Sequence, residues 1–461
     1  MNSTIVNPAT EAPIAEIPRH GADEADAAVA RSLEAGPAWR SVAPADRARL
    51  LRRFAVQVEE HGEELAQLET RNVGKPIAES RDEVGMVAEV LYFYAGAVDK
   101  HRGATVPVAG GVDMTFHEPL GVVAAIVPWN FPIAITSWKV GPALATGNTI
   151  VVKPAEATPL TALRLAELAL DAGIPEGVLQ VVVGKGSIVG THLVEHPDVA
   201  KVAFTGSTDV GRQVMARAAG TIKRVTLELG GKSASIVFDD ADIELAAAAT
   251  PAGVFANAGQ DCCARSRVLV HRPAFERYVS LLSEAVEAWT VGDPADPDTK
   301  MGPLVTADHR RVVQGFLGPG MGGPGGGPVP VHTVGAVPEG PGFWFPPTVV
   351  APAGAGWRMA REEIFGPVVA VIPFEDEEDA VRLANDTPFG LSGSIWTRDG
   401  ARSLRMARAV QAGNLSVNSN SSVRVQTGFG GMKQSGFGRE LGLEALASYT
   451  DIKNVFVATE G

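Results

Sequence analysis

The chain has 461 residues, of which 45% are hydrophobic, so it can bury a large core and is expected to form two or three domains. Its net charge of −13 argues against a nucleic-acid-binding surface, and we expect neither a secretory signal nor a membrane span, since the apolar run 120–129 is too short to cross a bilayer. The only two cysteines, Cys262 and Cys263, are adjacent, which excludes long-range disulfides and favours a reducing cytoplasm.

The first part of the chain contains a helical pattern followed by a strand pattern. Apolar residues recur at spacings of three, four and seven over 44–72, which predicts one amphipathic helix. Over 101–118, two alternating segments flank a turn at Gly110 and predict a β-hairpin. Two strands alone are marginal in water, so the hairpin should pack on another element or on another subunit. The strand-like segment 452–457 is available as its partner.

Short apolar segments alternate with helical segments between residues 120 and 240, and a second such series begins after Lys232. Alternation of this kind predicts βαβ units and parallel sheets. The expected fold is therefore α/β, with two doubly wound domains and a separate β-hairpin element. The segment 315–330 is so rich in Gly and Pro that we expect a surface loop there.

Two glycine motifs lie where phosphate groups could bind. In GKGSIVG at 184–190, the third glycine comes one place too late for the dinucleotide fingerprint, and turn glycines explain it equally well. In FTGST at 204–208, Ser207 opens a predicted helix whose free N–H groups could hold phosphate oxygens. A plain N-cap is about as good an explanation on local grounds.

Lys153 and Glu156 follow a predicted strand at its carboxyl end, where the ribose of a nucleotide could bind. A carboxylate there would accept from the 2′-OH of NAD and repel the 2′-phosphate of NADP. Without other context, a solvated pair at a helix start is the preferred interpretation. His192 and His196 are four residues apart, but no cysteine or carboxylate cluster accompanies them, so we interpret them as surface residues and predict no metal site.

An amide and a thiol are the other candidates for chemistry. The two prolines of PWNFP stiffen the backbone around Asn130, which could fix an oxyanion donor or form an ordinary turn. Cys262 follows a small, polar segment in which Gly259 would admit a ligand, whereas Asp261 would raise a thiol pKa. A buried apolar cysteine and a nucleophile therefore stay equally open. Glu228 could reach Cys262 only through tertiary folding.

The motifs PWNFP, KPAEATPLTAL, FTGST, LELGGKS, GQDC, EEIFGPV and GGMKQSGFGRELG occur in this order. Together they resemble the aldehyde dehydrogenase superfamily over nearly the whole chain. The resemblance implies a hydrolytic, non-acylating, NAD(P)-dependent enzyme. It also implies a nucleotide-binding domain of 1–100 and 119–230, a catalytic domain of 231–435, and an oligomerisation or bridging element of 101–118 and 436–461.

The resemblance further implies roles for individual residues. Cys262 would be the nucleophile, Glu228 the general base and Asn130 the oxyanion donor, assisted by the backbone N–H of Cys262. The implied cofactor is NAD rather than NADP, and its implied contacts are Trp129, Lys153, Glu156, Ser207, Val210, Glu363 and Phe365. The implied apolar substrate contacts are Phe131, Trp138 and Phe429.

The expected reaction is oxidation of an aldehyde to the carboxylic acid through a thiohemiacetal and a thioester, with water activated by Glu228. A cofactor-free thiol esterase and a non-catalytic structural or binding protein on the same fold are the alternatives. The expected partners are a small aldehyde and other copies of the chain, in a homodimer or homotetramer. No nucleic acid or membrane partner is expected.

Overall fold

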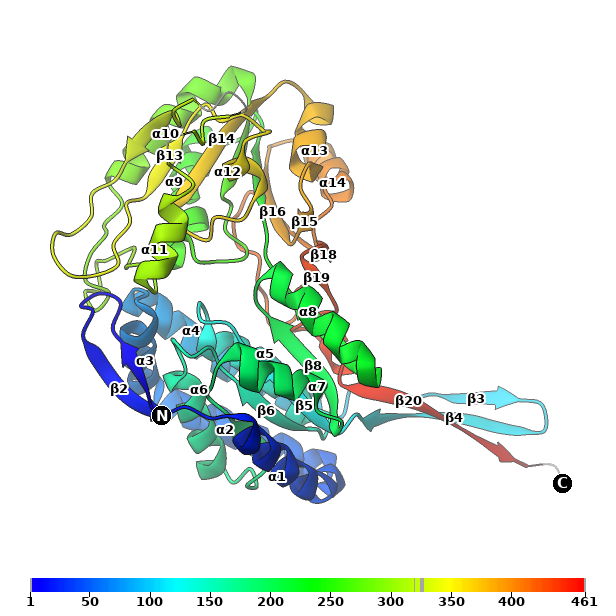
Figure 1. The fold of residues 1–461 in the computed structure, drawn as a ribbon. Helices are drawn as coiled ribbons and strands as arrows, with labels where there is room; N and C mark the ends of the chain where they lie inside the picture. The colour runs from blue at the N-terminus through cyan, green and yellow to red at the C-terminus, as the bar shows by residue number, and fades with distance from the viewer. Residues whose placement is uncertain (1, 319, 324–326, 460–461) are drawn as a thin grey trace.

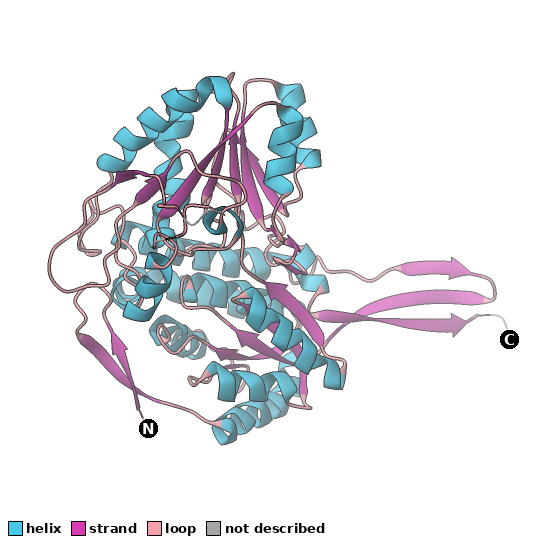
Figure 2. Cartoon of the chain, turned by 45° about the horizontal axis from the view of Figure 1, so that its top comes forward, coloured by secondary structure: helices cyan, strands magenta, loops and turns pink. Residues whose placement is uncertain are grey.

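The computed structural model describes residues 2–318, 320–323 and 327–459. The chain forms two bodies, each built on a largely parallel sheet, and a narrow arm that projects from the lower body in Figure 1. Helices flank the sheets of both bodies (Figure 2). This arrangement agrees with the α/β fold class that the sequence predicts.

The lower body contains a six-stranded sheet with the order β19-β9-β8-β5-β6-β7. Its strands are β5 (Val122–Ile126), β6 (Thr149–Lys153), β7 (Leu179–Val181), β8 (Val199–Thr205), β9 (Arg224–Glu228) and the short antiparallel β19 (Gly436–Phe437). The connecting helices are α5 (Pro132–Ala145), α6 (Leu160–Asp171), α7 (Thr191–Glu195) and α8 (Thr208–Ala218), with the π-helix η1 (Gly186–Gly190) before α7. The chain runs outward from β5 to β6 and β7, and then crosses to β8 on the other side of β5. A reversal of this kind opens a ligand crevice at the carboxyl ends of the strands.

The N-terminal segment supplies a hairpin and four helices. These are β1 (Asn2–Val6), β2 (Pro13–Pro18), α1 (Ala22–Ser41), α2 (Pro44–Glu60), α3 (Gly62–Val73) and α4 (Ile77–Ala97). The single helix predicted over 44–72 is wrong, because two helices meet at His61. His61 has φ −102° and ψ 18°, and its Nδ1 lies 2.9 Å from Gln57 O at the end of α2. The side chain thereby caps α2, and Gly62 starts the next helix.

The upper body contains a seven-stranded sheet with the order β12-β13-β14-β11-β10-β16-β17, in which only β12 is antiparallel among the described strands. Its strands are β10 (Ala234–Val237), β11 (Arg267–His271), β12 (Val331–Val334), β13 (Thr348–Val350), β14 (Val368–Phe374), β16 (Ser392–Trp396) and β17 (Asn414–Val417). Its helices are α9 (Ile243–Phe255), α10 (Phe275–Glu287), α11 (Ala307–Gln314), α12 (Arg358–Arg361), α13 (Glu377–Asn385) and α14 (Gly400–Ala409). Between α11 and β12, the described residues of the predicted loop 315–330 form no helix or strand, and 319 and 324–326 lie outside the described residues.

The arm is a three-stranded antiparallel sheet of β3 (Thr105–Val108), β4 (Gly111–Pro119) and β20 (Thr450–Ala458). Gly110 makes the β3–β4 turn with φ +75°, a conformation that favours glycine. The predicted hairpin and its predicted terminal strand are confirmed. The predicted bridging element also includes 436–461, although β19 within that range pairs with β9 of the lower sheet.

The remaining elements are short. They are β15 (Phe389–Gly390), β18 (Met432–Lys433), α15 (Glu444–Ala447) and the 3₁₀ helices η2 (Ala219–Thr221), η3 (Ala256–Gly259) and η4 (Arg272–Ala274). Within the described ranges, no helix combines the length and the apolar character that crossing a bilayer would require.

Candidate active site

A cavity of about 240 Å³ lies where the two bodies meet, at the carboxyl ends of β5, β8 and β9. It brings together residues that are far apart in the sequence. The predicted site residues in its lining are Trp129, Asn130, Phe131, Ser207, Glu228, Cys262, Glu363 and Phe365. Both bodies contribute residues to the lining, so a ligand in the cavity would contact both of them.

The turn that precedes Cys262 is fixed by an unusual backbone. Asn257, Ala258 and Gly259 have φ values of 47°, 56° and 70°, three consecutive residues in the left-handed region. A side chain at Gly259 would begin 2.4 Å from the Gly366 carbonyl, so only glycine fits there. Gln260 closes the turn, because its Nε2 donates to Asn257 O over 2.9 Å. Cys262 is thereby held on the cavity wall.

The turn that precedes Cys262 also holds Asn130 in place. Its Nδ2 donates to Gln260 O over 2.9 Å, and Asn257 Nδ2 donates to Asn130 O over 2.8 Å. An amide NH₂ has two hydrogens, so one N–H of Asn130 is left for a ligand. In the described part of the chain, no acceptor is bonded to the backbone N–H of Cys262. Two N–H donors are therefore available beside the thiol.

The two adjacent thiols have different surroundings. Cys262 is partly exposed and lines the cavity, whereas Cys263 is buried. The Cys263 N–H donates to Asp261 Oδ1 over 2.8 Å. A hydrogen bond with the Cys263 side chain, together with burial and the Asp261 charge, raises the pKa of Cys262 well above its usual value. Of the two cysteines, Cys262 is the one that lines the cavity.

Glu228 ends β9 and is buried, and within the described residues neither carboxylate oxygen has a hydrogen-bond partner. Burial, followed by the nearby Glu440, raises the pKa of Glu228 well above its usual value. Glu440 itself pairs with Lys139, whose Nζ donates to Thr205 Oγ1 over 2.8 Å. A side chain at Gly430 would begin 2.6 Å from Glu228 Oε1, so this glycine leaves room for the carboxylate.

Sequence reasoning missed Asn257, Lys139 and Glu440. Asn257 precedes the cysteines in a small, polar segment, and Glu440 lies in the last motif, where nothing nearby in the sequence indicates its partner. Each acts through a tertiary contact, and only Glu440 lies within one of the quoted motifs, so the sequence carries no signal for the roles of Asn257 and Lys139.

A sequence profile described as the aldehyde dehydrogenase family matches residues 2–455. The chain belongs to this family. It is 42% identical over 461 residues to the NADP/NAD-dependent aldehyde dehydrogenase PuuC of Escherichia coli (strain K12), a match that covers 99% of this chain and 92% of that protein. It is 37% identical over 466 residues to the betaine aldehyde dehydrogenase of Bacillus subtilis (strain 168), with 99% and 94% covered.

A solved structure agrees with the sequence relatives. The NAD+ complex of aldehyde dehydrogenase from Bacillus cereus superposes with a TM-score of 0.97 at 40% identity, and the match covers 100% of this chain and 94% of that chain. The predicted family and fold class are confirmed. Membership supports NAD(P)-dependent oxidation of an aldehyde as the general class of reaction for this aldehyde dehydrogenase.

The part of the cavity nearest β8 suits a nicotinamide dinucleotide. Ser207 caps α8 by accepting a hydrogen bond from Val210 N. The N-terminus of α8 lies at the point where the strand order of the sheet reverses, a place where phosphate groups can bind. Glu363 Oε1 accepts from Gly231 N over 2.8 Å, and burial raises the pKa of Glu363 to about 7. Gly230 has no room for a side chain, since a Cβ would lie 2.3 Å from Glu363 Oε2. These residues form a close-fitting cradle.

The other predicted cofactor contacts lie outside the cavity lining. Lys153 ends β6, where its buried Nζ donates to Pro154 O over 3.0 Å and burial lowers its pKa to about 8. Glu156 Oε1 lies 2.9 Å from Arg19 Nε, a contact that the sequence did not suggest. Val210 is exposed on α8. Their assignment to the adenosine half of the cofactor stays a prediction.

Of the three predicted substrate contacts, one lines the cavity and two do not. Phe131 lines the cavity. Trp138 and Phe429 are not in its described lining, because both rings are buried and pack edge to face with centroids 5.3 Å apart. They belong to the same apolar cluster as Cys262 and Phe131. Their contact with substrate stays a prediction.

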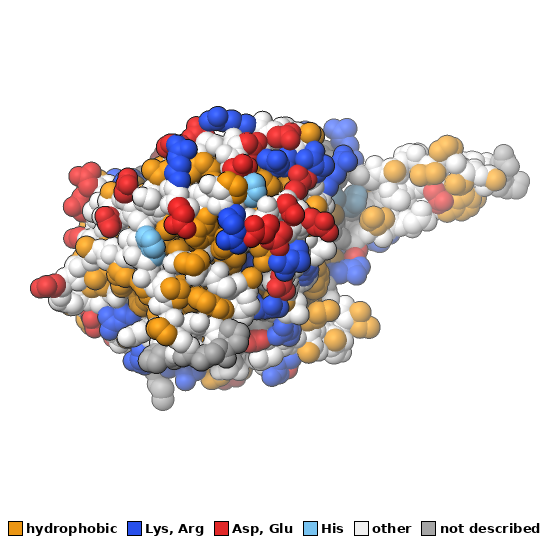
Figure 3. Space-filling view, turned by 90° about the horizontal axis from the view of Figure 1, so that it is seen from above, with side chains coloured by type: hydrophobic (Ala, Val, Ile, Leu, Met, Phe, Trp, Pro, Cys, Tyr) orange, Lys and Arg blue, Asp and Glu red, His pale blue; other side chains and the backbone are white. Residues whose placement is uncertain are grey.

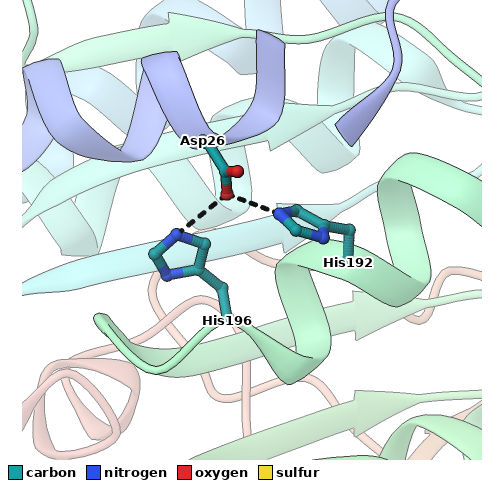
Figure 4. A group of neighbouring side chains, drawn as sticks. All are labelled: Asp26, His192 and His196. Carbon is teal, nitrogen blue, oxygen red and sulfur yellow. Dashed lines mark hydrogen bonds and ion pairs between the residues drawn. The ribbon is translucent and has the colours of Figure 1, made fainter. Parts of the chain in front are cut away.

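His192 and His196 share a carboxylate that comes from α1, as Figure 4 shows. Asp26 Oδ1 lies 2.5 Å from His192 Nε2 and 3.2 Å from His196 Nε2. The Asp198 N–H donates to His196 Nδ1 over 3.1 Å, which keeps the proton of a neutral His196 on Nε2. That nitrogen then donates to Asp26 rather than binding a metal. The cluster is best explained as a hydrogen-bonded link between α1 and α7.

Proposed function

We propose that the chain oxidises an aldehyde to the carboxylic acid, with NAD as the hydride acceptor and Cys262 as the nucleophile. The observation that carries the proposal is that Cys262, Asn130 and Glu228 line one cavity together with Ser207 and Glu363. A thiol, an oxyanion donor and a base therefore face the space that a dinucleotide would share.

The chain's own residues can perform each chemical step. After Cys262 has lost its proton, its sulfur attacks the aldehyde carbon, and the oxyanion that forms accepts from Asn130 Nδ2 and from the Cys262 backbone N–H. When bound, the cofactor supplies the acceptor for the hydride that leaves this carbon. The acyl group then remains on Cys262 as a thioester. Glu228 removes a proton from the water that attacks this thioester. The bond between the acyl carbon and the Cys262 sulfur then breaks, the acid is released, and the sulfur leaves as the thiolate.

Both ionisable groups act in their deprotonated form. The pKa values of Cys262 and Glu228 are raised above their ordinary values, so each loses its proton only at a higher pH than an exposed thiol or carboxyl group. The rate is therefore expected to rise with pH until both are ionised.

We assign the predicted binding residues to parts of the ligands. Ser207 and the N-terminus of α8 would hold the pyrophosphate, Lys153 and Glu156 the adenosine ribose, and Val210 the adenine. The nicotinamide half would contact Trp129, Glu363 and Phe365. The aldehyde would contact Phe131, Trp138 and Phe429, which supports an apolar side chain on the substrate.

The test is to add short, aromatic, anionic and amino aldehydes with NAD and follow the reduced cofactor. The wild type should accumulate it with at least one aldehyde, Cys262→Ser should not, and the matched control Cys263→Ser should retain turnover. Unchanged turnover in Cys262→Ser would refute the proposal. Ester cleavage without aldehyde oxidation at any NAD concentration would favour the thiol esterase, and no NAD binding by calorimetry would favour a non-catalytic protein.

We further propose that the arm packs against another copy of the chain, in a homodimer or homotetramer. Hydrophobic side chains are visible on the arm in Figure 3, and the exposed fractions of Ile452 and Phe456 are 68% and 51%. Exposure of this kind marks an interaction surface. Light scattering should give a multiple of the chain mass, and the double change Ile452→Asp with Phe456→Asp should lower it. A monomeric wild type would contradict this. The cytoplasmic location stays a prediction.

A further inference from the structure

The N-terminal hairpin brings Arg19 to the carboxyl ends of β6 and β7. The residue after Arg19 is fixed through its backbone and its side chain, because His20 N donates to Val183 O over 2.7 Å and Val183 N donates to His20 Nδ1 over 3.1 Å. Ile17 and Val183 also pack in one apolar cluster. The position of Arg19 is therefore set by the fold and not by a free surface chain.

Arg19 faces the carboxylate that we assign to the adenosine ribose. Its Nε lies 2.9 Å from Glu156 Oε1 and donates to Ser3 Oγ over 3.1 Å. Within the described residues, its two terminal nitrogens donate no hydrogen bond. The side chains of Arg19 and Glu156 are 34% and 29% exposed, so a ligand can reach both, although Glu156 Oε1, the oxygen next to Arg19, is itself buried.

We infer that Arg19 is a specificity-determining residue that allows this enzyme to bind NADP as a second cofactor besides NAD. The inference rests on the proposed role of Glu156 at the ribose. A carboxylate alone repels a 2′-phosphate, but the charge of Glu156 is balanced by Arg19. The unused terminal N–H groups of a guanidinium form the planar fork that binds phosphate oxygens. Glu156 then favours NAD through the 2′-hydroxyl, and Arg19 makes NADP acceptable.

Calorimetric binding of NAD and of NADP, without aldehyde, tests the inference. Arg19→Ala should weaken NADP binding about 10- to 100-fold, the value of a charged hydrogen-bonded contact, and change NAD binding little. Arg31→Ala is a matched control. It removes the same charge from α1, where Arg31 Nε donates to Gln180 Oε1 over 2.9 Å, and should change neither affinity. Arg19→Lys, which keeps the charge and loses the fork, should give an intermediate NADP affinity.

The outcomes separate this inference from the proposed function. Wild type that binds NAD but not NADP would overturn the inference alone. Arg19→Ala that weakens both cofactors equally, or leaves the ratio of the two dissociation constants unchanged, would also overturn it. Wild type that binds neither cofactor would instead overturn the proposed function. Melting temperatures of all variants, expected to match the wild type, show that each is folded.

Discussion

Asn130 offers the sharpest test of the proposed chemistry, because its structural role is small. Asn130→Ala removes one protein hydrogen bond, from Nδ2 to Gln260 O. Asn148 is a matched buried asparagine outside the cavity lining. Its side chain accepts from Gly121 N over 2.9 Å and donates to Thr146 Oγ1 over 2.8 Å and to Tyr449 O over 2.9 Å. Asn148→Ala therefore removes three hydrogen bonds.

The two variants should rank in one order for stability and in the opposite order for turnover. At about 1 kcal/mol for each hydrogen bond, Asn130→Ala should lower the free energy of unfolding by about 1 kcal/mol and Asn148→Ala by about 3 kcal/mol. Loss of an oxyanion donor costs about 100- to 1000-fold in kcat, or about 2.7–4 kcal/mol in the transition state. Asn130→Ala should show this loss, whereas folded Asn148→Ala should turn over like the wild type.

The assay combines kcat for a substrate that the wild type oxidises with thermal or urea unfolding of each variant. The reasoning holds if the less stable variant is the more active one. Asn130→Ala with wild-type kcat would refute the oxyanion role. An equal loss of kcat in Asn148→Ala, measured where it is folded, would show that the loss reflects general damage to the protein.

Three further predictions concern Glu228. Glu228→Gln should release one equivalent of reduced cofactor in a rapid burst and then turn over about 100- to 10,000-fold more slowly. Steady turnover at the wild-type rate would contradict the role of Glu228 as the base. Glu440→Gln removes a negative charge that raises the pKa of Glu228. Because the base is active when ionised, the pH at half-maximal kcat should fall. A pH–rate profile that is unchanged or moves to higher pH would be evidence against this. Gly430→Ala places a Cβ 2.6 Å from Glu228 Oε1 and 2.8 Å from Gly438 O, so it should lower kcat more than the control Gly428→Ala, whose Cβ would meet nothing closer than 3.5 Å. Equal kcat values would show that the site tolerates the added methyl group.

The α/β architecture was predictable because it follows from local patterns. Apolar segments of strand length alternate with helical periodicity, and each folds as its pattern indicates. The arm was predictable for the same reason, since the alternation over 101–118 and over 452–457 marks strands that need partners. The break at His61 was not, because a side chain that caps one helix and precedes Gly62 leaves the apolar periodicity of the segment intact.

The candidate site was predictable as a set of motifs and not as a set of contacts. Asn130 and Cys262 lie in recognisable motifs, but the residues that position or tune the site reach it across the fold. Lys139 meets Glu440 over 301 positions of sequence, and Arg19 meets Glu156 through a hairpin whose turn also contacts the other body. A local sequence pattern does not indicate contacts between residues so far apart in the chain, because such contacts form only when the chain packs.

The left-handed backbone before Cys262 bears on how this enzyme could be engineered for heat resistance. Ala258 has φ 56°, which costs a residue with a side chain about 1–2 kcal/mol, whereas glycine adopts it freely. A protein engineer seeking thermostability would choose Ala258→Gly to relieve this cost. The same change would give the turn more freedom and would position Cys262 less firmly. Heat resistance and catalytic speed are therefore opposed at this one alanine.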